Sequence, residues 1–374
     1  MNTAGEQSDR GRLEADARTG RPAGIRNRTL IVPSVICSHV VADHIADHVE
    51  GAVAASHDHG CAQIGDDEAT TRRTLTNLAR NPNIAGALFV GLGCETIQSG
   101  SLLDAVRESG IPVESVVIQE VGGTDACIES GIAAIERVRA TAGDGKQVRV
   151  RTDELTVGII SSDLRESTIR HGEPLVGEVI DRILDNGGRV VVAGSERFVA
   201  ARDVAENRLA TERARDGFAT MVDRKRRQSS HVTAIHRRAS SLSPQQLLGP
   251  LGDRPIEDVL AYGQRATHEQ GVALVDAPAG FAEATTALAA SGAQIVIHVT
   301  AEGVPTGHPV VPVCKVTGSP ETAAALPEDI DIDARTMTPD ESYHRFRTNV
   351  QGTPTCAERH GLSDVAITRL GPSM

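Results

Sequence analysis

Short apolar runs that end in glycine-rich turns recur along this chain, and they restrict the folds that it can adopt. Each run is too uniformly apolar for a half-exposed strand and indicates a strand buried on both faces, as in a parallel sheet. Alternation of such strands with helices predicts an α/β fold of doubly wound, mostly parallel, Rossmann-like layers. The predicted strands are 29–37 (TLIVPSVIC), 85–95 (AGALFVGLGCE), 114–124 (ESVVIQEVGGT), 155–163 (LTVGIISSD), 188–196 (GRVVVAGSE), 271–280 (GVALVDAPAG) and 293–303 (AQIVIHVTAEG).

The stretches between these strands are predicted helices. Because aromatic residues make up only 2% of the chain, with no Trp, the core between helices and strands must consist of Val, Ile, Leu and Ala. The predicted helices are 40–51 (VVADHIADHVEG), 67–80 (DEATTRRTLTNLAR), 101–110 (SLLDAVRESG), 174–188 (PLVGEVIDRILDNGG) and 279–292 (AGFAEATTALAASG).

A chain of 374 residues exceeds the usual size of a single core, so two or three α/β units are expected. We place the first at 25–145, a second at 150–250 and a third at 255–374. Residues 1–24 are polar and charged and are expected to be disordered.

The net charge of −12 argues against a nucleic-acid partner. The one basic run, 223–240 (DRKRRQSSHVTAIHRRAS), lacks interleaved aromatics and is expected to be a solvated helix and loop. No apolar run is long enough to span a membrane, and a cytoplasmic location is expected. The chain has only the lysines Lys146, Lys225 and Lys315, which fits either a halophilic, salt-rich cytoplasm or the codon bias of a GC-rich genome.

Residues 56–67 (SHDHGCAQIGDD) combine imidazole and thiol groups with glycine. In an extended backbone His57, His59 and Cys61 would share one face, and their side chains suit iron, zinc or a similar metal. The alternative is an ordinary glycine-containing loop with surface histidines. The six cysteines lie far apart in sequence, so free thiols or metal ligands are favoured over a disulfide framework.

Carboxylates lie at the ends of the apolar runs of two predicted strands. Glu95 follows Cys94, and Glu120 follows Gln119 in the same relation to the next strand. A carboxylate there is costly unless it is paired, bound to metal or protonated, or unless it turns to solvent. Both alternatives stay open for each residue.

Lys315 lies in the apolar run 310–317 (VVPVCKVT), where a desolvated ammonium could bind an anion or act as a base. The alternative is a lysine that extends to the sheet edge. His298, within another apolar strand, is interpreted as a core histidine. The glycine turns lack a full dinucleotide-binding fingerprint, which argues against NAD.

Together these stretches resemble the altronate/galactarate dehydratase family, which includes the large subunit of sulfolactate sulfo-lyase. The resemblance covers roughly residues 24–131 and 255–374. It is carried by 24–46 (GIRNRTLIVPSVICSHVVADHIA), SHDHGCAQIGDD, 75–95 (LTNLARNPNIAGALFVGLGCE), 118–124 (IQEVGGT) and 304–334 (VPTGHPVVPVCKVTGSPETAAALPEDIDIDA).

The resemblance implies a hydro-lyase that dehydrates a sugar acid to a 2-keto-3-deoxy acid with a divalent metal, Fe(2+) or alternatively Mn(2+). It implies that His57, His59 and Cys61 bind the metal, and that Glu95 or Glu120 is an acid/base or a further ligand. Contacts with the substrate are expected from Arg26, Asn27, Gly122, Gly123 and Lys315, the last of which is also a candidate catalytic residue.

The chain departs from the family in three respects. It lacks the usual SAF-type domain, so a separate small SAF-type subunit is an expected partner, and a homo-oligomer is compatible with the sequence. Residues 163–177 (DLRESTIRHGEPLVG) replace the family's CGGSDxxSGxxANP stretch, and 231–253 (HVTAIHRRASSLSPQQLLGPLGD) replace its NPSPGNxxGGxTT loop before a helix expected at 255–263 (PIEDVLAYG). A sulfolactate-type carbon–sulfur lyase and a non-catalytic relative are therefore the alternatives.

Overall fold

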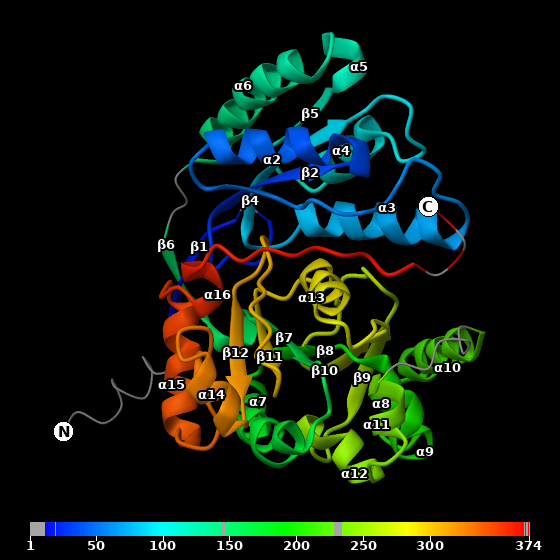
Figure 1. Ribbon diagram of the computed structural model, residues 1–374, viewed down its shortest axis with the longest axis vertical. Coiled ribbons are helices and arrows are strands. Elements are labelled where there is room, and N and C mark those ends of the chain that lie inside the picture. Colours follow the sequence, from blue (N-terminus) through cyan, green and yellow to red (C-terminus); the bar gives the residue numbers. More distant parts are fainter. Residues whose placement is uncertain are drawn as a thin grey trace, which may run out of the picture.

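The computed structural model describes residues 12–18, 20–143, 147–227, 234–369, 371 and 373. Within these ranges the chain forms a four-stranded and a seven-stranded sheet, both parallel, and a small antiparallel pair. Helices lie between the two large sheets and on their outer faces (Figure 1). The predicted doubly wound, mostly parallel α/β fold is confirmed.

The four-stranded sheet has the order β3-β2-β4-β5, with every neighbouring pair parallel. All eight residues of β4 are buried, as its continuous apolar sequence predicted. The strands are β2 (Arg28–Pro33), β3 (Ala52–Ala54), β4 (Ile84–Gly91) and β5 (Val113–Val117).

Helices cover both faces of this sheet. On the outer face, Ile45 of α2 (His39–His48) and Ile135 of α6 (Thr124–Ala142) pack in one cluster with Leu88 of β4. On the other face, α3 (Asp66–Ala79) and α4 (Ser99–Arg107) pack against alternate residues of the same strands. The alternation of side chains along each strand thus supplies two apolar faces.

The seven-stranded sheet has the order β13-β12-β11-β7-β8-β10-β9 and is also parallel. Because the expected units at 150–250 and 255–374 both contribute strands, they share one sheet. Residues 256–260, expected to be helical, form an edge strand instead. The strands are β7 (Thr156–Ser161), β8 (Arg189–Val192), β9 (Ile256–Leu260), β10 (Gly271–Val275), β11 (Ile295–Val299), β12 (Val313–Thr317) and β13 (Ile332–Asp333).

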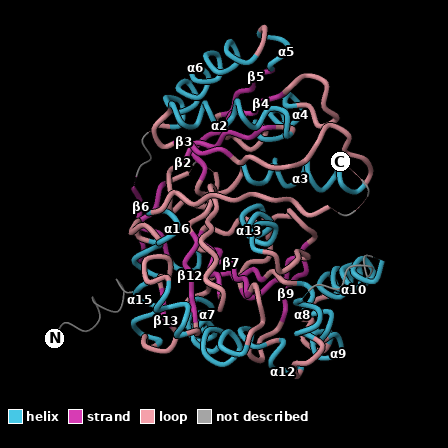
Figure 2. The backbone as a smooth tube through the Cα atoms, in the orientation of Figure 1, coloured by secondary structure: helices cyan, strands magenta, loops and turns pink. Residues whose placement is uncertain are grey.

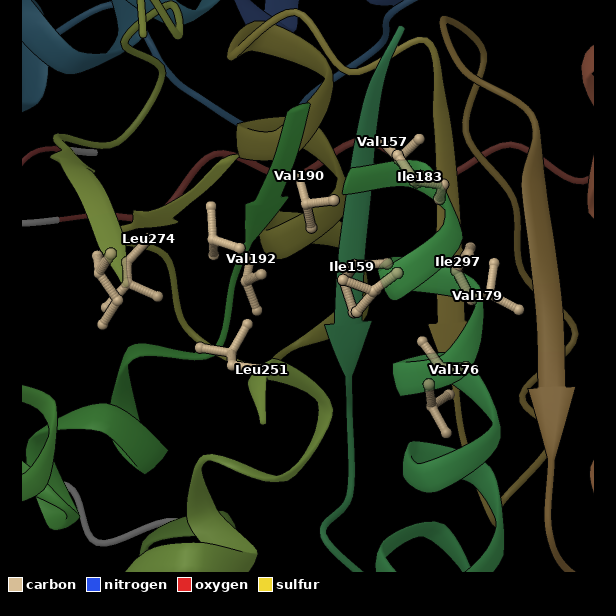
Figure 3. Close-up of a cluster of buried hydrophobic side chains, with 14 of the residues drawn as sticks. Val157, Ile159, Val176, Val179, Ile183, Val190, Val192, Leu251, Leu274 and Ile297 are labelled. Carbon is tan, nitrogen blue, oxygen red and sulfur yellow. The ribbon is translucent and has the colours of Figure 1, made fainter. Parts of the chain in front are cut away.

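The outer face of this sheet is covered by α7 (Glu173–Asp185). Figure 3 shows Val176, Val179 and Ile183 of this helix directed toward Ile159 of β7 and Ile297 of β11. The apolar face of the helix and the apolar face of the sheet therefore pack together in one layer.

Two helices separate the sheets and pack on each other. α3 belongs to the unit of the four-stranded sheet, and α13 (Phe281–Ala290) belongs to the unit of the seven-stranded sheet. Alanines dominate α13, which allows a close approach. The Asn81 side chain after α3 donates hydrogen bonds of 2.8 Å to the carbonyls of Ala289 and Ala293. The two units therefore share a continuous core (Figure 1).

The N-terminal segment differs from the expectation of disorder over 1–24. Residues 12–16 form β1 (Arg12–Asp16), which pairs antiparallel with β6 (Gln147–Arg151). Leu13 and Ala15 are buried against the seven-stranded unit, so burial of apolar side chains orders this strand. Residues 1–11 of the expected segment lie outside the described residues.

The C-terminal segment 362–369 has no regular structure and runs between the two units, where Figures 1 and 2 both show it passing toward the start of α3. No described helix combines the length and apolarity that crossing a bilayer requires. The remaining helices are α5 (Ile118–Val121), α8 (Ser195–Ala200), α9 (Arg202–Glu206), α10 (Glu212–Arg227), α11 (Ala234–Ala239), α12 (Pro244–Leu247), α14 (Pro320–Ala325), α15 (Pro339–Val350) and α16 (Cys356–Arg359).

The basic run 223–240 spans the end of α10 and the whole of α11, and most of its arginines are exposed or half-exposed. Its middle, residues 228–233, lies outside the described part of the chain. The expected solvated helical structure is thus present before residue 228 and after residue 233.

Candidate active site

The carboxyl ends of four adjacent parallel strands meet at one edge of the four-stranded sheet. In sheets of this kind, ligands bind beyond the carboxyl ends of the strands. We call the loops at this edge the carboxyl edge, and they comprise residues 34–38 after β2, 55–64 after β3, 92–98 after β4 and 118–124 after β5. Most of the predicted catalytic and metal-binding residues lie here.

His57 is buried, and both of its ring nitrogens are engaged. Its Nδ1 accepts a hydrogen bond of 3.2 Å from the His59 backbone N–H, so Nε2 carries the proton and donates to the Pro33 carbonyl at 2.9 Å. Burial and the neighbouring His59 lower the pKa of His57 to about 4. A neutral imidazole held in this way links β2 to the loop that follows β3.

His59 is also buried, and its Nε2 donates to the carbonyl of Ile367 at 2.9 Å. Its Nδ1 lies 3.2 Å from Oε1 of Gln63 and 3.4 Å from the Thr71 hydroxyl. Asp58, in the same loop as His59, forms an ion pair of 3.0 Å with Arg369 of the C-terminal segment. His59 therefore holds the C-terminal segment against the carboxyl edge.

These contacts change the interpretation of the predicted metal ligands. His57 and His59 direct their ring nitrogens to backbone carbonyls, away from a common point with Cys61. In the described ranges, no three His, Cys, Asp or Glu side chains are arranged to hold a single metal ion. The ion site expected from His57, His59 and Cys61 is not formed by this geometry.

Cys61 lies instead beside other thiols. Its Sγ is 4.0 Å from Sγ of Cys37, which follows β2. Desolvation, the hydrogen bond with Cys37, and the nearby Cys94 and Glu95 together raise the pKa of Cys61. Cys37, Cys61 and Cys94 thus each follow one of three neighbouring strands at the carboxyl edge, and the first two have their sulfurs side by side.

Glu95 is 3% exposed, and its carboxylate is fully engaged in hydrogen bonds. Oε1 accepts from the Ser34 hydroxyl at 2.7 Å and from the Leu92 N–H at 3.2 Å, while Oε2 accepts from the Gly93 N–H at 2.6 Å. The sequence left open whether this carboxylate is buried and paired or turned to solvent, and in the structure it is buried and paired. Glu95 is arranged to fix the turn that carries Cys94.

Glu120 has the opposite environment, since its side chain is exposed in the short helix α5. Gly122 and Gly123 follow, both with positive φ (98° and 122°), and lead into the first turn of α6. No described side chain caps α6, and open space surrounds both glycines. The free N–H groups at this helix start, beside an accessible carboxylate, suit binding of an anionic substrate group.

Arg26 and Asn27 lie at the amino end of β2, away from the carboxyl edge. Arg26 makes two hydrogen bonds of 2.8 Å to the Glu358 carboxylate, which join the start of β2 to α16. Asn27 lines a cavity of about 400 Å³ together with Glu136 and Arg139. These two predicted substrate contacts are therefore separated from Glu120 and the thiols.

Lys315 lies in the other sheet, on β12, and is completely buried. It is paired in register with His298 of β11. Burial lowers the pKa of Lys315, while Asp329 and Asp331 oppose this effect. Among the described residues its Nζ has no hydrogen-bond partner. Lys315 thus does not extend to the sheet edge, and it is not part of the carboxyl edge.

The replaced segment 163–177 lines a separate cavity of about 1050 Å³ at the carboxyl ends of β7 and β11. Leu164 there has a φ of 53°, a left-handed conformation that is strained for leucine. The arginines Arg165, Arg170, Arg238 and Arg335 contribute to the lining. The two segments that depart from the family, 163–177 and 231–253, thus both contribute residues to one polar cavity.

Sequence reasoning missed Cys37 and Ser34 as members of the candidate site. The available signal was their position, because both lie toward the carboxyl end of a predicted strand, as Cys94 and Glu95 do. Their proximity to the other residues depends on which strands are neighbours, and the linear sequence does not state strand order.

Comparison with known proteins identifies the family of the chain. The family model for the second domain of D-galactarate dehydratase/altronate hydrolase matches residues 17–143, and the model for the D-galactarate/altronate dehydratase C-terminal domain matches residues 249–373. Altronate dehydratases of Bacillus subtilis and Escherichia coli are 26% and 27% identical, over 88% and 96% of this chain and 70% and 77% of their own. The (2R)-sulfolactate sulfo-lyase subunit beta of Chromohalobacter salexigens is 25% identical over 93% of this chain and 94% of its own.

Proposed function

Because the chain belongs to the D-galactarate/altronate dehydratase family, we propose that it is a hydro-lyase that converts a sugar acid into a 2-keto-3-deoxy acid. Its relatives include proteins named altronate dehydratase and sulfolactate sulfo-lyase, both of which are lyases. In the proposed reaction, the proton α to the carboxylate is removed and the β-hydroxyl leaves as water. The resulting enol then tautomerises to the keto acid.

The observation that carries the proposal is the proximity of Glu120 to the uncapped start of α6. An exposed carboxylate can take the α-proton, and the first N–H groups of the helix can hold the substrate carboxylate. The same N–H groups stabilise the negative charge that develops when the proton leaves. Glu95 does not suit this role, since its oxygens are engaged by Ser34, Leu92 and Gly93.

A divalent metal, Fe(2+) or Mn(2+), would stabilise the same developing charge as a Lewis acid. The expected ligands His57 and His59 do not fit this role, because their ring nitrogens are committed to Pro33 and Ile367. We therefore derive no step through a metal held by these histidines. The substrate contacts proposed here are Glu120 and the first N–H groups of α6, which follow Gly122 and Gly123; the N–H groups of these two glycines themselves donate to the Ile118 carbonyl.

A carbon–sulfur lyase is the second candidate. The chain covers 94% of the sulfo-lyase subunit, against 70% and 77% of the two altronate dehydratases. The name of that relative also denotes one subunit of an assembly, which supports our proposal of a separate small SAF-type subunit as partner. In this reaction the same α-proton is removed, but sulfite leaves in place of water.

Product analysis tests both candidates. The protein is incubated anaerobically with aldonates, aldarates and (2R)-sulfolactate, with and without a SAF-type subunit, and 2-keto-3-deoxy acid or sulfite is measured. The Glu120→Gln variant is expected to lower kcat/KM by about 10²–10⁴-fold, because it removes the base. Glu129→Gln, at another exposed position of the neighbouring helix α6, is the control and keeps full activity.

A keto acid without sulfite supports the hydro-lyase, and sulfite supports the second candidate. No product from any substrate, even with the subunit, overturns both and indicates a non-catalytic relative. Full activity of Glu120→Gln would show that the base lies elsewhere.

A further inference from the structure

The six cysteines of the chain differ in exposure. Three of them are buried, and burial raises the pKa of each of these thiols, which keeps them protonated and unreactive. They are Cys127, Cys314 and Cys356. The other three, Cys37, Cys61 and Cys94, are exposed or half-exposed, and all lie at the carboxyl edge. Reaction with a thiol reagent in solution is therefore confined to this edge.

Cys37 and Cys61 lie side by side there. Their sulfurs are 4.0 Å apart, and they come from the loops after β2 and β3, which are neighbouring parallel strands. The sulfurs of a disulfide are about 2.05 Å apart, so the two have to approach by about 2 Å. Rotation of the side chains can contribute to this movement, because Cys37 is exposed and Cys61 is half-exposed.

The backbones that carry the two thiols are also held together. The N–H of Ile36, next to Cys37, donates to the carbonyl of His59 at 2.8 Å, and His59 lies two residues before Cys61. A disulfide requires Cα atoms within about 7 Å of each other, and this hydrogen bond keeps the two loops in contact beside the thiols. The pair is thus arranged for a bond that closes residues 37–61 into a ring.

We propose that Cys37 and Cys61 form a reversible disulfide when the protein meets a small-molecule disulfide. Cys37, the more exposed thiol, attacks one sulfur of the reagent as the thiolate, which breaks the S–S bond of the reagent and releases one thiol. Cys61 then loses its proton and attacks the sulfur of Cys37, and the second thiol leaves. The protein loses two electrons and two protons, which convert the reagent into two thiols. An excess of thiol reverses the exchange.

The disulfide is coupled to the proposed active site through Cys61. The carbonyl of Cys61 accepts hydrogen bonds from the hydroxyl and the N–H of Thr96, at 2.8 and 3.3 Å. In the same loop as Thr96, the Leu92 carbonyl accepts the N–H of Gln119 at 3.1 Å, and Gln119 precedes Glu120. A constraint on the Cys61 loop therefore reaches the position of the proposed base. This consequence rests on the proposed function, whereas formation of the disulfide does not.

The test uses the full chain with Cys94→Ser, in which five of the six thiols remain and only Cys37 and Cys61 are accessible. The reduced protein is incubated with oxidised glutathione, quenched with acid and unfolded, and its thiols and its mass are measured. We expect the count to fall from five to three, out of the six of the natural chain, with no glutathione attached. Cleavage after Glu50, between the two cysteines, is expected to leave the fragments joined until dithiothreitol is added.

Adding Cys61→Ser to the Cys94→Ser chain separates the two steps of the exchange. This variant cannot resolve the mixed disulfide, so it is expected to retain one glutathione on Cys37. The matched control adds Cys127→Ala instead, which removes a buried thiol of α6, and it still loses two thiols without attached glutathione. Far-UV circular dichroism shows whether each variant keeps the fold.

An unchanged thiol count overturns the proposal, and so does the loss of two thiols as two attached glutathione molecules. Loss of two thiols with nothing attached supports it, and this readout needs no substrate, so it is independent of the proposed function. With a substrate in hand, the oxidised protein is expected to show a kcat/KM about 10–100-fold below that of the reduced protein. Equal activity of the two forms overturns the coupling to Glu120.

Discussion

The Ser34 hydroxyl donates a 2.7 Å hydrogen bond to the buried carboxylate of Glu95, and this contact joins the end of β2 to the turn after β4. The same carboxylate accepts two backbone N–H groups of that turn. One charged side chain thus holds together the segments that present Cys37 and Cys94. The first prediction concerns the stability that this arrangement contributes.

Replacing Glu95 with alanine leaves a hydroxyl and two backbone N–H groups without their acceptor in a buried place. We expect the free energy of unfolding to fall by about 2–4 kcal/mol, measured by urea denaturation. Ser34→Ala removes one hydrogen bond only and should cost about 1 kcal/mol. The exposed Glu108→Ala serves as the control. Equal stability of Glu95→Ala and wild type would contradict a structural role for Glu95.

The second prediction concerns a buried ion pair in the other unit. Arg197 of α8 contacts both carboxylate oxygens of Glu173, at 2.5 and 3.0 Å, and both side chains are at most 3% exposed. Arg197→Met leaves the carboxylate buried without its partner, so a loss of about 3–5 kcal/mol is expected in chemical denaturation.

The double variant Arg197→Met/Glu173→Leu should recover much of this loss, because no buried charge remains. Arg202→Met, which breaks the solvent-exposed pair with Glu206, is the matched control and leaves the denaturation midpoint unchanged. A double variant as unstable as the single one would show that packing, rather than charge, causes the loss.

The third prediction is a loss of stability in mild acid. Burial lowers the pKa of His298 and of His308 to about 3, and the next contributions come from Lys315 and Arg28 respectively. In the unfolded chain a histidine titrates near 6.5, so between about pH 6.5 and 3 the unfolded state binds more protons. Stability contributed by these neutral rings is complete above pH 6.5 and decreases as the pH falls.

Each buried histidine adds up to about 1.4 kcal/mol per pH unit to this slope. His308→Asn keeps an acceptor for the Val310 N–H, which now bonds Nδ1, but it cannot be protonated. Its unfolding free energy should therefore fall less steeply than that of wild type between pH 6.5 and 4.5. The exposed His344→Asn is the control with an unchanged slope, and parallel curves for His308→Asn and wild type would refute the assignment.

The fourth prediction compares two helical glycines. A Cβ on Gly131 of α6 would lie 2.3 Å from Cδ1 of Ile45, so Gly131→Val should cost about 1–3 kcal/mol or more through overpacking between α6 and α2. Gly100 of α4 has open space around it, and Gly100→Ala should stabilise by about 0.5 kcal/mol. Thermal unfolding measures both, and shifts of the same sign would contradict this comparison.

The architecture was largely predictable because the central strands are continuous apolar runs. All seven predicted strands and the five helices predicted between them are present, although their bounds differ, whereas the further helix expected at 255–263 is a strand. The strand β9 escaped prediction because Glu257 and Asp258 interrupt its apolar pattern. β1 and β6 are mostly polar and are defined by pairing with each other across more than a hundred residues.

The candidate site was predictable in part. Strand ends are recognisable in the sequence, so the chemistry-bearing residues after β3, β4 and β5 were identified. The roles of His57 and His59 were not, because their hydrogen bonds go to carbonyls 24 and 308 positions away. The resemblance implied substrate contacts at Arg26 and Lys315, but the placement of Arg26 depends on Glu358 and that of Lys315 on the order of strands in the second sheet.

The segment 362–369 supplies a contact that the loop after β3 requires, although the two are synthesised far apart in time. Its Ile367 carbonyl is the partner of His59, in a loop made more than three hundred residues earlier. Until residue 367 has been synthesised, the loop after β3 lacks that anchor, even if the first sheet has already formed. The carboxyl edge therefore becomes complete only after the whole seven-stranded unit, which lies between the two partners in sequence, has been made.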